Sequence, residues 1–349
     1  MRLRFGNLIQ ATRNILPFVL LIAMQSPAAA QTPPQRLVLA YAGGPKRPAY
    51  TTDDFVHLIS VVDTGGRPTG WLFDAVLFTE FQAASGRYYM PWVKGTPSMG
   101  EDWAVYLDSL FAPQGPLTRL DSAAGAVAAA AGTPLRRIGI AVMIPYPDPH
   151  GDTLRFGGKA FSMRSDSARA GAAGAYIDEV ERRFAEHRTA HVALVAFYWL
   201  NEGITPADTG LVPRVARSVH ARGAAFLWIP SYKAAGADRW RALGFDEAWL
   251  QPNYFFHPDV AMTRFDSALA AARATSMGLE IEFDRRMFNS WLFVDRLEPY
   301  LGALESAVDL RSKPIAVYEG AGALIQLSHA KDPWHRALYE RFVRVLRPE

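Results

Sequence analysis

The sequence predicts a single-domain (β/α)8 barrel of the TIM type, an α/β fold. Eight short apolar runs alternate with amphipathic stretches along residues 31–349, and this alternation is typical of parallel strands joined by right-handed helical crossovers. The runs are mostly continuous, as expected for strands that are covered on both faces. No linker or shift in composition divides the chain, and 50% hydrophobic content can supply one large core. Eight such units fit a barrel of this length.

The elements follow from the periodicity of the apolar residues. Val212, Val215 and Val219 recur at helical spacing. An Ala-rich stretch at 123–131 also reads as helix, while long connections at 82–102 and 147–167 follow strand ends, where barrel enzymes place their sites. Further helices are indicated by Ile177, Val180 and Phe184, and by Trp334, Leu338, Phe342 and Val345. The expected strands lie at 37–42, 73–81, 138–146, 192–200, 225–229, 247–251, 279–283 and 315–318.

An open, doubly wound sheet is the alternative fold. It would need a Gly-rich phosphate turn between the first strand and a helix. The candidate turn is Ala42-Gly43-Gly44-Pro45, where a proline follows the glycines and no helix begins. The sequence therefore favours the closed barrel.

The N-terminus is expected to be a secretory signal over residues 1–30. Arg2, Arg4 and Arg13 supply its positive region, an apolar stretch at 15–24 is short for a bilayer span, and Ala28–Ala30 supplies small residues for cleavage. This predicts a periplasmic or secreted protein that is cleaved near Ala30. We expect no stable membrane insertion of the mature chain, which would be one barrel domain over 31–349.

Charge and cysteine content narrow the class of function. Three of the 37 Lys and Arg residues lie in the predicted signal and no acid does, so the mature chain balances 34 basic against 34 acidic residues. The basic pI therefore gives no reason to expect a nucleic-acid partner. The chain has no cysteine, which excludes disulfides, thiolate chemistry and lipoprotein anchoring.

Two acidic clusters at strand ends carry the strongest chemical signal. Asn201 and Glu202 end the fourth run, and Glu280 and Glu282 alternate along the seventh. Because side chains alternate across a strand, Glu280, Glu282 and Asp284 share one face, and the apolar residues between them must meet the helices. The acids are therefore expected to face the barrel axis, where two carboxylates are the equipment of glycoside hydrolysis.

Other polar and aromatic residues fall at the same ends of the predicted strands. Flat rings suit the apolar faces of sugars, and Asn and Gln suit their hydroxyls. The predicted substrate-binding residues are Asn201, Glu280, Tyr198, Trp228, Tyr232, Gln251, Asn253, Tyr254, Tyr146, Asp148, Glu80 and Glu319. Trp228, Tyr232 and Tyr254 are expected to be stacking platforms. For any one ring, ordinary barrel packing is the alternative.

Metal and serine chemistry are less well supported. The eight histidines show no metal-binding motif, and only His150 and His257 fall near strand ends. Asp148, His150 and Asp152 alternate within one loop, which leaves a metal-dependent hydrolase open as an alternative. No Gly-x-Ser-x-Gly elbow occurs. We expect no metal and no other cofactor at the site.

Several motifs resemble an uncharacterised bacterial family, domain of unknown function 4855. The resemblance spans about 37–324 and rests on five motifs, Pro145-Tyr146-Pro147-Asp148-Pro149, Phe197-Tyr198-Trp199-Leu200-Asn201-Glu202, Leu227-Trp228-Ile229-Pro230, Leu250-Gln251-Pro252-Asn253-Tyr254-Phe255 and Glu280-Ile281-Glu282-Phe283-Asp284. It implies no defined activity. Members tend to be exported or joined to carbohydrate-binding modules, which favours a glycan role.

A more distant similarity is to retaining glycosidases of clan A. These are barrels whose acid/base Glu follows an Asn on the fourth strand and whose nucleophile is a Glu on the seventh. The similarity implies Glu202 as acid/base and Glu282 as nucleophile, although Glu280 competes with Glu282 and leaves an inverting variant open. We therefore predict an exported glycoside hydrolase of the retaining type that acts on a polysaccharide or oligosaccharide. The alternatives are a non-catalytic glycan-binding barrel and the metal-dependent hydrolase.

Overall fold

The computed structural model describes residues 31–44, 47, 49–91, 95–132, 137–320 and 322–347. Within them, parallel strands close into a barrel in the order β1-β4-β5-β8-β9-β10-β11-β12. Each strand overlaps one of the eight predicted runs, so the barrel prediction is confirmed. The predicted signal, residues 1–30, lies outside the described residues. The barrel strands are β1 (Arg36–Tyr41), β4 (Ala75–Thr79), β5 (Ile138–Ile144), β8 (Val192–Trp199), β9 (Ala225–Trp228), β10 (Glu247–Leu250), β11 (Gly278–Glu282) and β12 (Ile315–Tyr318).

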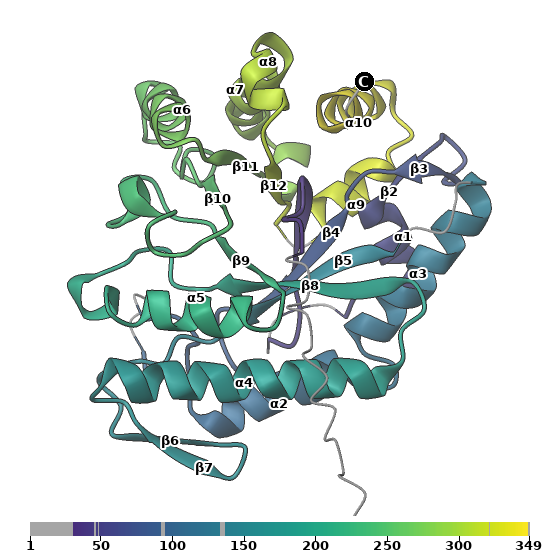
Figure 1. Ribbon diagram of the computed structural model, residues 1–349. Helices are drawn as coiled ribbons and strands as arrows, with labels where there is room; N and C mark the ends of the chain where they lie inside the picture. The colour runs from purple at the N-terminus through teal and green to yellow at the C-terminus, as the bar shows by residue number, and fades with distance from the viewer. Residues whose placement is uncertain are drawn as a thin grey trace, which may run out of the picture.

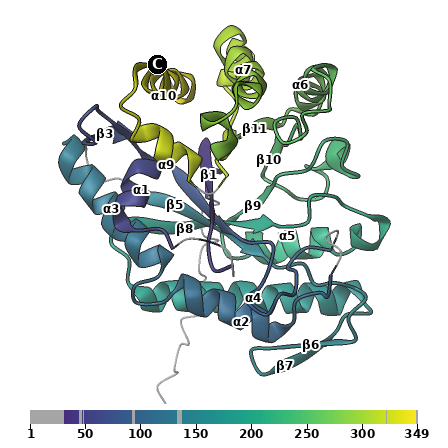
Figure 2. The ribbon, with the colours of Figure 1, turned by 180° about the vertical axis from the view of Figure 1, so that it is seen from behind.

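Helices cover the outside of the barrel (Figure 1). α2 and α4 lie along one side, and α6, α7 and α10 lie on the opposite side in both views (Figures 1 and 2). No helix in the described ranges is long and apolar enough to cross a bilayer. The helices are α1 (Thr52–Ile59), α2 (Gly100–Leu110), α3 (Pro116–Ala131), α4 (Asp166–His187), α5 (Val212–His220), α6 (Thr263–Thr275), α7 (Trp291–Ser306), α8 (Val308–Arg311), α9 (Ala323–Ser328) and α10 (Pro333–Leu346).

Local signals explain where three of the helices begin. Ser165 and Asp332 cap α4 and α10 with their side chains, and Thr51 forms a capping box with Asp54 at α1. α4 buries Tyr176 and the predicted Ile177 and Val180 against the barrel. Capping satisfies backbone N–H groups that the helix leaves free, so these side chains fix where each crossover starts.

The structure departs from strict strand–helix alternation in three connections. Only a 3-10 turn, Ala237–Arg239, separates β9 from β10, because Pro230 and Gly236 keep that segment in turns. The loop predicted at 147–167 contains a hairpin, β6 (Thr153–Phe156) and β7 (Lys159–Ser162), which extends beyond α2 and α4 in Figure 2. A second short hairpin, β2 (Ser60–Val62) and β3 (Pro68–Trp71), follows α1.

The register of β10 and β11 determines which polar groups meet inside the barrel. Trp249 pairs with Gly278 and Leu250 with Leu279. Continuing this register by one residue brings Gln251 beside Glu280, on the same face as Trp249 and Gly278. The indole of Trp249 is fully buried and occupies the space that a side chain at Gly278 would need. A Cβ at Gly278 would lie 2.6 Å from Trp249 Cδ1 and 2.2 Å from the carbonyl oxygen of Pro314. A glycine at this position therefore lets the two strands pair with this register.

We expect Gly278→Ala to lower the free energy of unfolding by about 1–3 kcal/mol, the usual cost of overpacking a core. The measurement is urea unfolding followed by fluorescence. Gly302→Ala is the matched control, because Gly302 lies within α7 and a Cβ there meets no atom within 4 Å. Helix propensity alone should then make this control neutral or more stable by up to about 1 kcal/mol. Equal effects of the two substitutions would contradict the packing argument.

Candidate active site

The acids of β11 face the interior of the barrel. Glu280 and Glu282 are 0% and 1% exposed. Between and beyond them the strand turns its apolar residues outward, where Phe283 meets Phe342 of α10 with ring centroids 5.4 Å apart. Register with β12 places Glu282 beside Tyr318. The alternation expected from the sequence is therefore present in the structure.

Glu282 is held by hydrogen-bond donors. The hydroxyl of Tyr300, on α7, donates to Glu282 Oε2, and the backbone N–H of Tyr254 donates to the same oxygen at 3.3 Å. Burial raises the pKa of Glu282 to about 7, while the bonds from Tyr300 and the backbone oppose that rise. Donors of this kind favour the ionised form. Glu282 thus has a raised pKa, and two hydrogen-bond donors are in place to stabilise its carboxylate form.

Glu202 lies just beyond β8 and is partly exposed. Burial and the nearby carboxyl of Glu282 raise the pKa of Glu202 to about 8. Glu202 also lines a cavity of about 630 Å³, together with Asn201, Tyr146, His150, Asn253 and His257. The site therefore joins an acid that is protonated at neutral pH to an open cavity.

Glu280 lies one step deeper than Glu282 along the same face. Burial raises its pKa well above the usual range, and Glu282 and Glu202 add to the rise. Among the described residues, neither carboxyl oxygen of Glu280 has a hydrogen-bond partner of regular geometry. The amide of Gln251 lies close enough to oppose part of the shift. Burial and the neighbouring acids therefore favour the protonated form of Glu280.

A chain of bonds orients Gln251. The backbone N–H of Tyr232 donates to Asn253 Oδ1 at 3.0 Å, and Asn253 Nδ2 donates to Gln251 Oε1 at 2.8 Å. With its oxygen occupied in this way, Gln251 presents its NH2 group to Glu202 and Glu280, and this group lowers the pKa of both acids. Asn253 adopts a left-handed backbone, with φ of 50°. The predicted Gln251 and Asn253 thus lie in one network with the acids.

Tyrosines surround the acids inside the barrel. Tyr198 on β8 is buried, and Glu202 and Glu280 contribute to raising its pKa well above the usual value, mainly an effect of burial. Tyr41 and Tyr318 meet edge to face at 5.4 Å. Sequence reasoning missed Tyr41 and Tyr300. The position of Tyr41 at the end of the first strand was a usable signal, whereas nothing in the sequence of α7 points to Tyr300.

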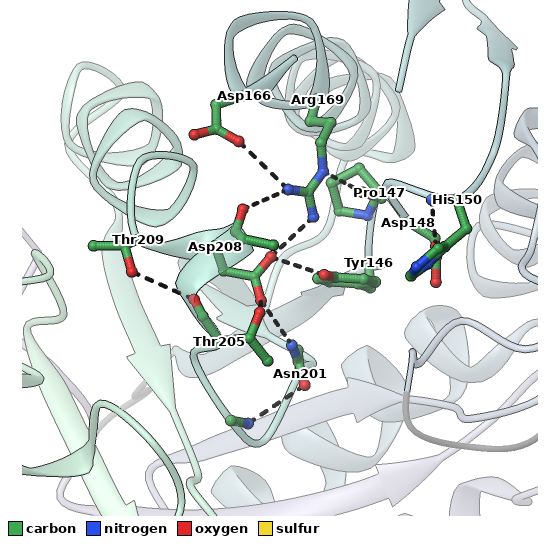
Figure 3. Close-up of polar contacts among 12 residues, drawn as sticks. Tyr146, Pro147, Asp148, His150, Asp166, Arg169, Asn201, Thr205, Asp208 and Thr209 are labelled. Carbon is green, nitrogen blue, oxygen red and sulfur yellow. Dashed lines mark hydrogen bonds and ion pairs between the residues drawn. The ribbon is translucent and has the colours of Figure 1, made fainter. Parts of the chain in front are cut away.

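Asp208 links several residues in one wall of the cavity through hydrogen bonds (Figure 3). Its role was not predicted from the sequence. It is fully buried in the turn after β8 and accepts bonds from Tyr146 Oη at 2.8 Å, Arg169 Nη2 at 2.9 Å and Thr205 Oγ1 at 2.9 Å. Asn201 Nδ2 lies 3.4 Å from Asp208 Oδ2, the oxygen that also accepts from Thr205. This network fixes the segment that carries Glu202.

The network changes the roles expected of two residues. The NH2 group of Asn201 donates to Asp208, and Asn201 Oδ1 accepts from the N–H of Gly203 at 3.4 Å. The hydroxyl of Tyr146 also donates to Asp208. Both residues line the cavity. Their polar atoms are engaged within the protein, so they shape the wall instead of offering free groups to a sugar hydroxyl.

The prediction that Trp228 and Tyr254 are stacking platforms is wrong. Trp228 has no exposed surface and stacks on Phe245, with ring centroids 4.9 Å apart. The register of β8 with β9 pairs Trp228 with Trp199, so both rings point away from the barrel axis. Tyr254 is 6% exposed, and the guanidinium of Arg296 lies 3.7 Å from its ring centroid. Neither ring offers a face to a ligand.

The third predicted platform, Tyr232, is partly exposed. Arg264 and Lys233 lie over its ring at 4.7 and 5.3 Å. A sugar stacking on this ring would share it with two cations, and the role of Tyr232 in binding remains a prediction.

The carboxylates of Glu80 and Glu319 are bonded to other groups of the protein. Glu80 pairs with Arg47 at 2.9 Å. Glu319 accepts bonds from the backbone N–H groups of Gly322 and Leu324, at 2.8 and 3.0 Å, at the start of α9. Burial nevertheless raises the pKa of Glu319 to about 7. The structure thus assigns both acids to holding loops at the barrel end.

The loop acids considered for a metal do not converge. Asp148 accepts from His150 Nδ1 at 2.9 Å, whereas Asp152 pairs with Arg164 at 3.0 Å. Within the described ranges, the group of acids and histidines spaced to share an ion lies elsewhere and does not include the glutamates of the mouth. These contacts do not support the metal-dependent hydrolase.

We expect the protein to lose stability as the pH rises above about 5. The buried glutamates keep their protons in the folded state but release them near pH 4.3 when unfolded, so the folded state binds more protons. Each such carboxyl steepens the loss by up to about 1.4 kcal/mol per pH unit. Glu280→Gln should make the slope of unfolding free energy against pH shallower and raise stability at pH 8. Urea unfolding at pH 5 to 8 measures this, with the exposed Glu101→Gln as control, and an unchanged slope would contradict a neutral Glu280.

Asp208→Asn should lower the free energy of unfolding by about 3–5 kcal/mol, because the buried guanidinium of Arg169 loses its buried carboxylate and keeps only the partly exposed Asp166, at 3.5 Å. Arg169 and Asp208 are 2% and 0% exposed. Glu186→Gln, which breaks an exposed pair with Arg182, is the control and should cost less than about 1 kcal/mol. Thermal unfolding of both variants tests this, and similar losses would show that the buried network is no more important than a surface pair.

Comparison with known proteins places the chain in a family. None of the curated proteins compared with it matches. Among solved structures, one similar chain is the catalytic domain of a family GH18 chitinase from the fern Peteris ryukyuensis, with 11% identity, a TM-score of 0.44, and coverage of 89% of this chain and 99% of that one. The model of the family described as Domain of unknown function (DUF4855) matches residues 36–344. The chain therefore belongs to the DUF4855 family.

Proposed function

We propose that this protein is a glycoside hydrolase of the retaining type, exported and acting on a polysaccharide or oligosaccharide. One observation carries the proposal. A partly exposed acid whose pKa is about 8, Glu202, is electrostatically coupled across the barrel mouth to Glu282, whose ionised form has two donors. The retaining reaction needs a protonated carboxyl as general acid and an ionised carboxylate as nucleophile.

In the first step, the carboxylate of Glu282 attacks the anomeric carbon. A glycosyl–carboxylate bond forms, the bond to the leaving oxygen breaks, and Glu202 gives that oxygen its proton. In the second step, Glu202 accepts a proton from water, the water oxygen bonds to the anomeric carbon, and the bond to Glu282 breaks. Both carboxyls then return to their starting protonation.

The surrounding residues serve these two roles. Tyr300 and the N–H of Tyr254 hold Glu282 in place and stabilise its negative charge when it leaves the sugar. Glu280 and the oriented NH2 of Gln251 lie close to the same carboxyls and supply hydrogen bonds to them or to a sugar hydroxyl. His150 and His257 add polar side chains to the wall of the cavity.

Stereochemistry and azide rescue test the mechanism. We expect NMR of hydrolysis of a panel of dinitrophenyl glycosides to show net retention for one of them. Glu282→Ala should lower kcat by at least about 10⁴-fold, and azide should restore turnover with an inverted glycosyl azide as product. Glu202→Ala should retain most of the first step on the activated substrate, and azide should give the azide with retained configuration. An inverted product from the parent protein would overturn the nucleophilic role.

Glu280→Gln is the matched variant for the nucleophile. It replaces an acid on the same face of β11 by an amide of nearly the same shape, and burial already favours the uncharged form of Glu280. We expect it to keep measurable activity and to give no azide rescue. Loss equal to that of Glu282→Ala, with rescue, would move the nucleophile to Glu280.

The pH profile of kcat/KM should be a narrow bell. The rate rises as Glu282 loses its proton near pH 7 and falls as Glu202 loses its proton near pH 8. Glu202→Gln should remove the alkaline limb measured on an activated substrate. If no glycan in a broad panel is cleaved but one is bound, and Glu202→Gln binds it equally well, the protein is the non-catalytic binding barrel.

A further inference from the structure

Two histidines and an aspartate come together on the outside of the barrel, between α1 and α9. Asp53 and His57 lie one turn apart on α1, and His329 directly follows α9. The two helices lie side by side in both views (Figures 1 and 2). One ligand atom from each of the three residues lies within 4.8 Å of the others. The two imidazole rings stack with centroids 3.7 Å apart.

Hydrogen bonding fixes which nitrogen of His57 is free. Its Nδ1 lies 2.8 Å from Ser328 Oγ, and that hydroxyl lies 2.7 Å from the carbonyl oxygen of Ile325. The carbonyl can only accept, so the single hydroxyl proton of Ser328 points to Ile325. Ser328 Oγ must then accept from His57, which places the imidazole proton on Nδ1. The lone pair of His57 is therefore on Nε2.

This arrangement is the one found at metal-binding histidines. Such residues donate their second N–H to a neighbouring oxygen, which fixes the tautomer and the ring. His57 is 3% exposed and held rigidly, whereas Asp53 and His329 are exposed and can rotate toward it.

We propose that Asp53, His57 and His329 bind one divalent transition-metal ion, with Zn²⁺ the best match. Two imidazoles and one carboxylate are donors that suit zinc, and three protein ligands leave a position for water. Stacked rings share an ion only when their nitrogen-bearing edges converge, and the rotation of exposed His329 supplies that convergence. The hard cations Ca²⁺ and Mg²⁺ prefer oxygen donors and do not suit this set.

The position of the site gives the ion a structural role. α1 follows β1 and α9 follows β12, and these two strands pair where the ends of the chain close the barrel. An ion held by both helices would fasten that closure from outside. Because the ion would bind the folded state alone, its binding should raise the unfolding temperature.

The test titrates the full, metal-free chain with CoCl2 and then displaces cobalt with ZnCl2. We expect visible d–d absorption of low-coordinate Co²⁺, its loss on adding Zn²⁺, and a higher unfolding temperature with Zn²⁺. His329→Gln and Asp53→Asn, both exposed, should fold normally and weaken cobalt binding at least about 10-fold, and Ser328→Ala should weaken it about 10-fold through the tautomer.

His220→Gln is the matched control. His220 is an exposed histidine whose Nε2 lies 2.8 Å from a carboxylate oxygen of Asp246, so it offers one histidine–carboxylate pair without a second histidine. This variant should bind cobalt as the parent does. No cobalt spectrum in the parent, or equal affinity in the parent, His329→Gln and Asp53→Asn, would overturn the proposal.

Discussion

The parallel register of β10, β11 and β12 is the constraint on which the rest of this structure depends. In a closed barrel every strand has one face toward the axis, so residues that are neighbours in register share that face. The pairing of Trp249 with Gly278 places Gln251 beside Glu280, and the pairing of Glu282 with Tyr318 places the outer acid beside a ring. A register slip of one residue would turn every acid of β11 toward the helices.

Burying several carboxyls in one apolar interior forces them to differ. Like charges held together in a medium of low polarity cannot all ionise, so each acid takes the protonation state that its donors allow. Glu282 has Tyr300 and a backbone N–H, Glu280 has neither, and Glu202 lies partly in the cavity. These environments separate the pKa values of acids that look alike in the sequence, and they determine which acid attacks and which donates in the proposed reaction.

Hydrogen-bond networks around the cavity position the segments that carry Glu202 and Gln251. Asp208 draws Arg169 of α4, Tyr146 of the loop after β5 and Asn201 into one buried network, and Glu202 is the next residue after Asn201. Asn253 performs a similar task for Gln251. Polar groups that the sequence suggested for the ligand thus serve in part to hold the acids, which is the role expected when buried polar atoms must be satisfied. The proposed zinc site would add a further tie between the chain ends.

The sequence by itself determined the barrel and the acid row. Continuous apolar runs identify all eight strands, and the period of two along residues 279–283 places Glu280 and Glu282 on the inner face, because these patterns depend only on local geometry. It was also sufficient to bring Glu202, Gln251 and Asn253 to the same end of the barrel. Family membership agrees with the resemblance that the motifs indicated.

Only the tertiary structure decided what each side chain does there. The orientation of Trp228 depends on the register between β8 and β9, the burial of Tyr254 depends on Arg296 from α7, and Tyr300 reaches Glu282 from a helix that no strand pattern predicts. The engagement of Asn201 with Asp208 and the fastening of Glu80 by Arg47 are likewise contacts between segments distant along the chain or folded back upon it. Such contacts are set by packing between elements, and the periodicity of a single strand or helix carries no information about them.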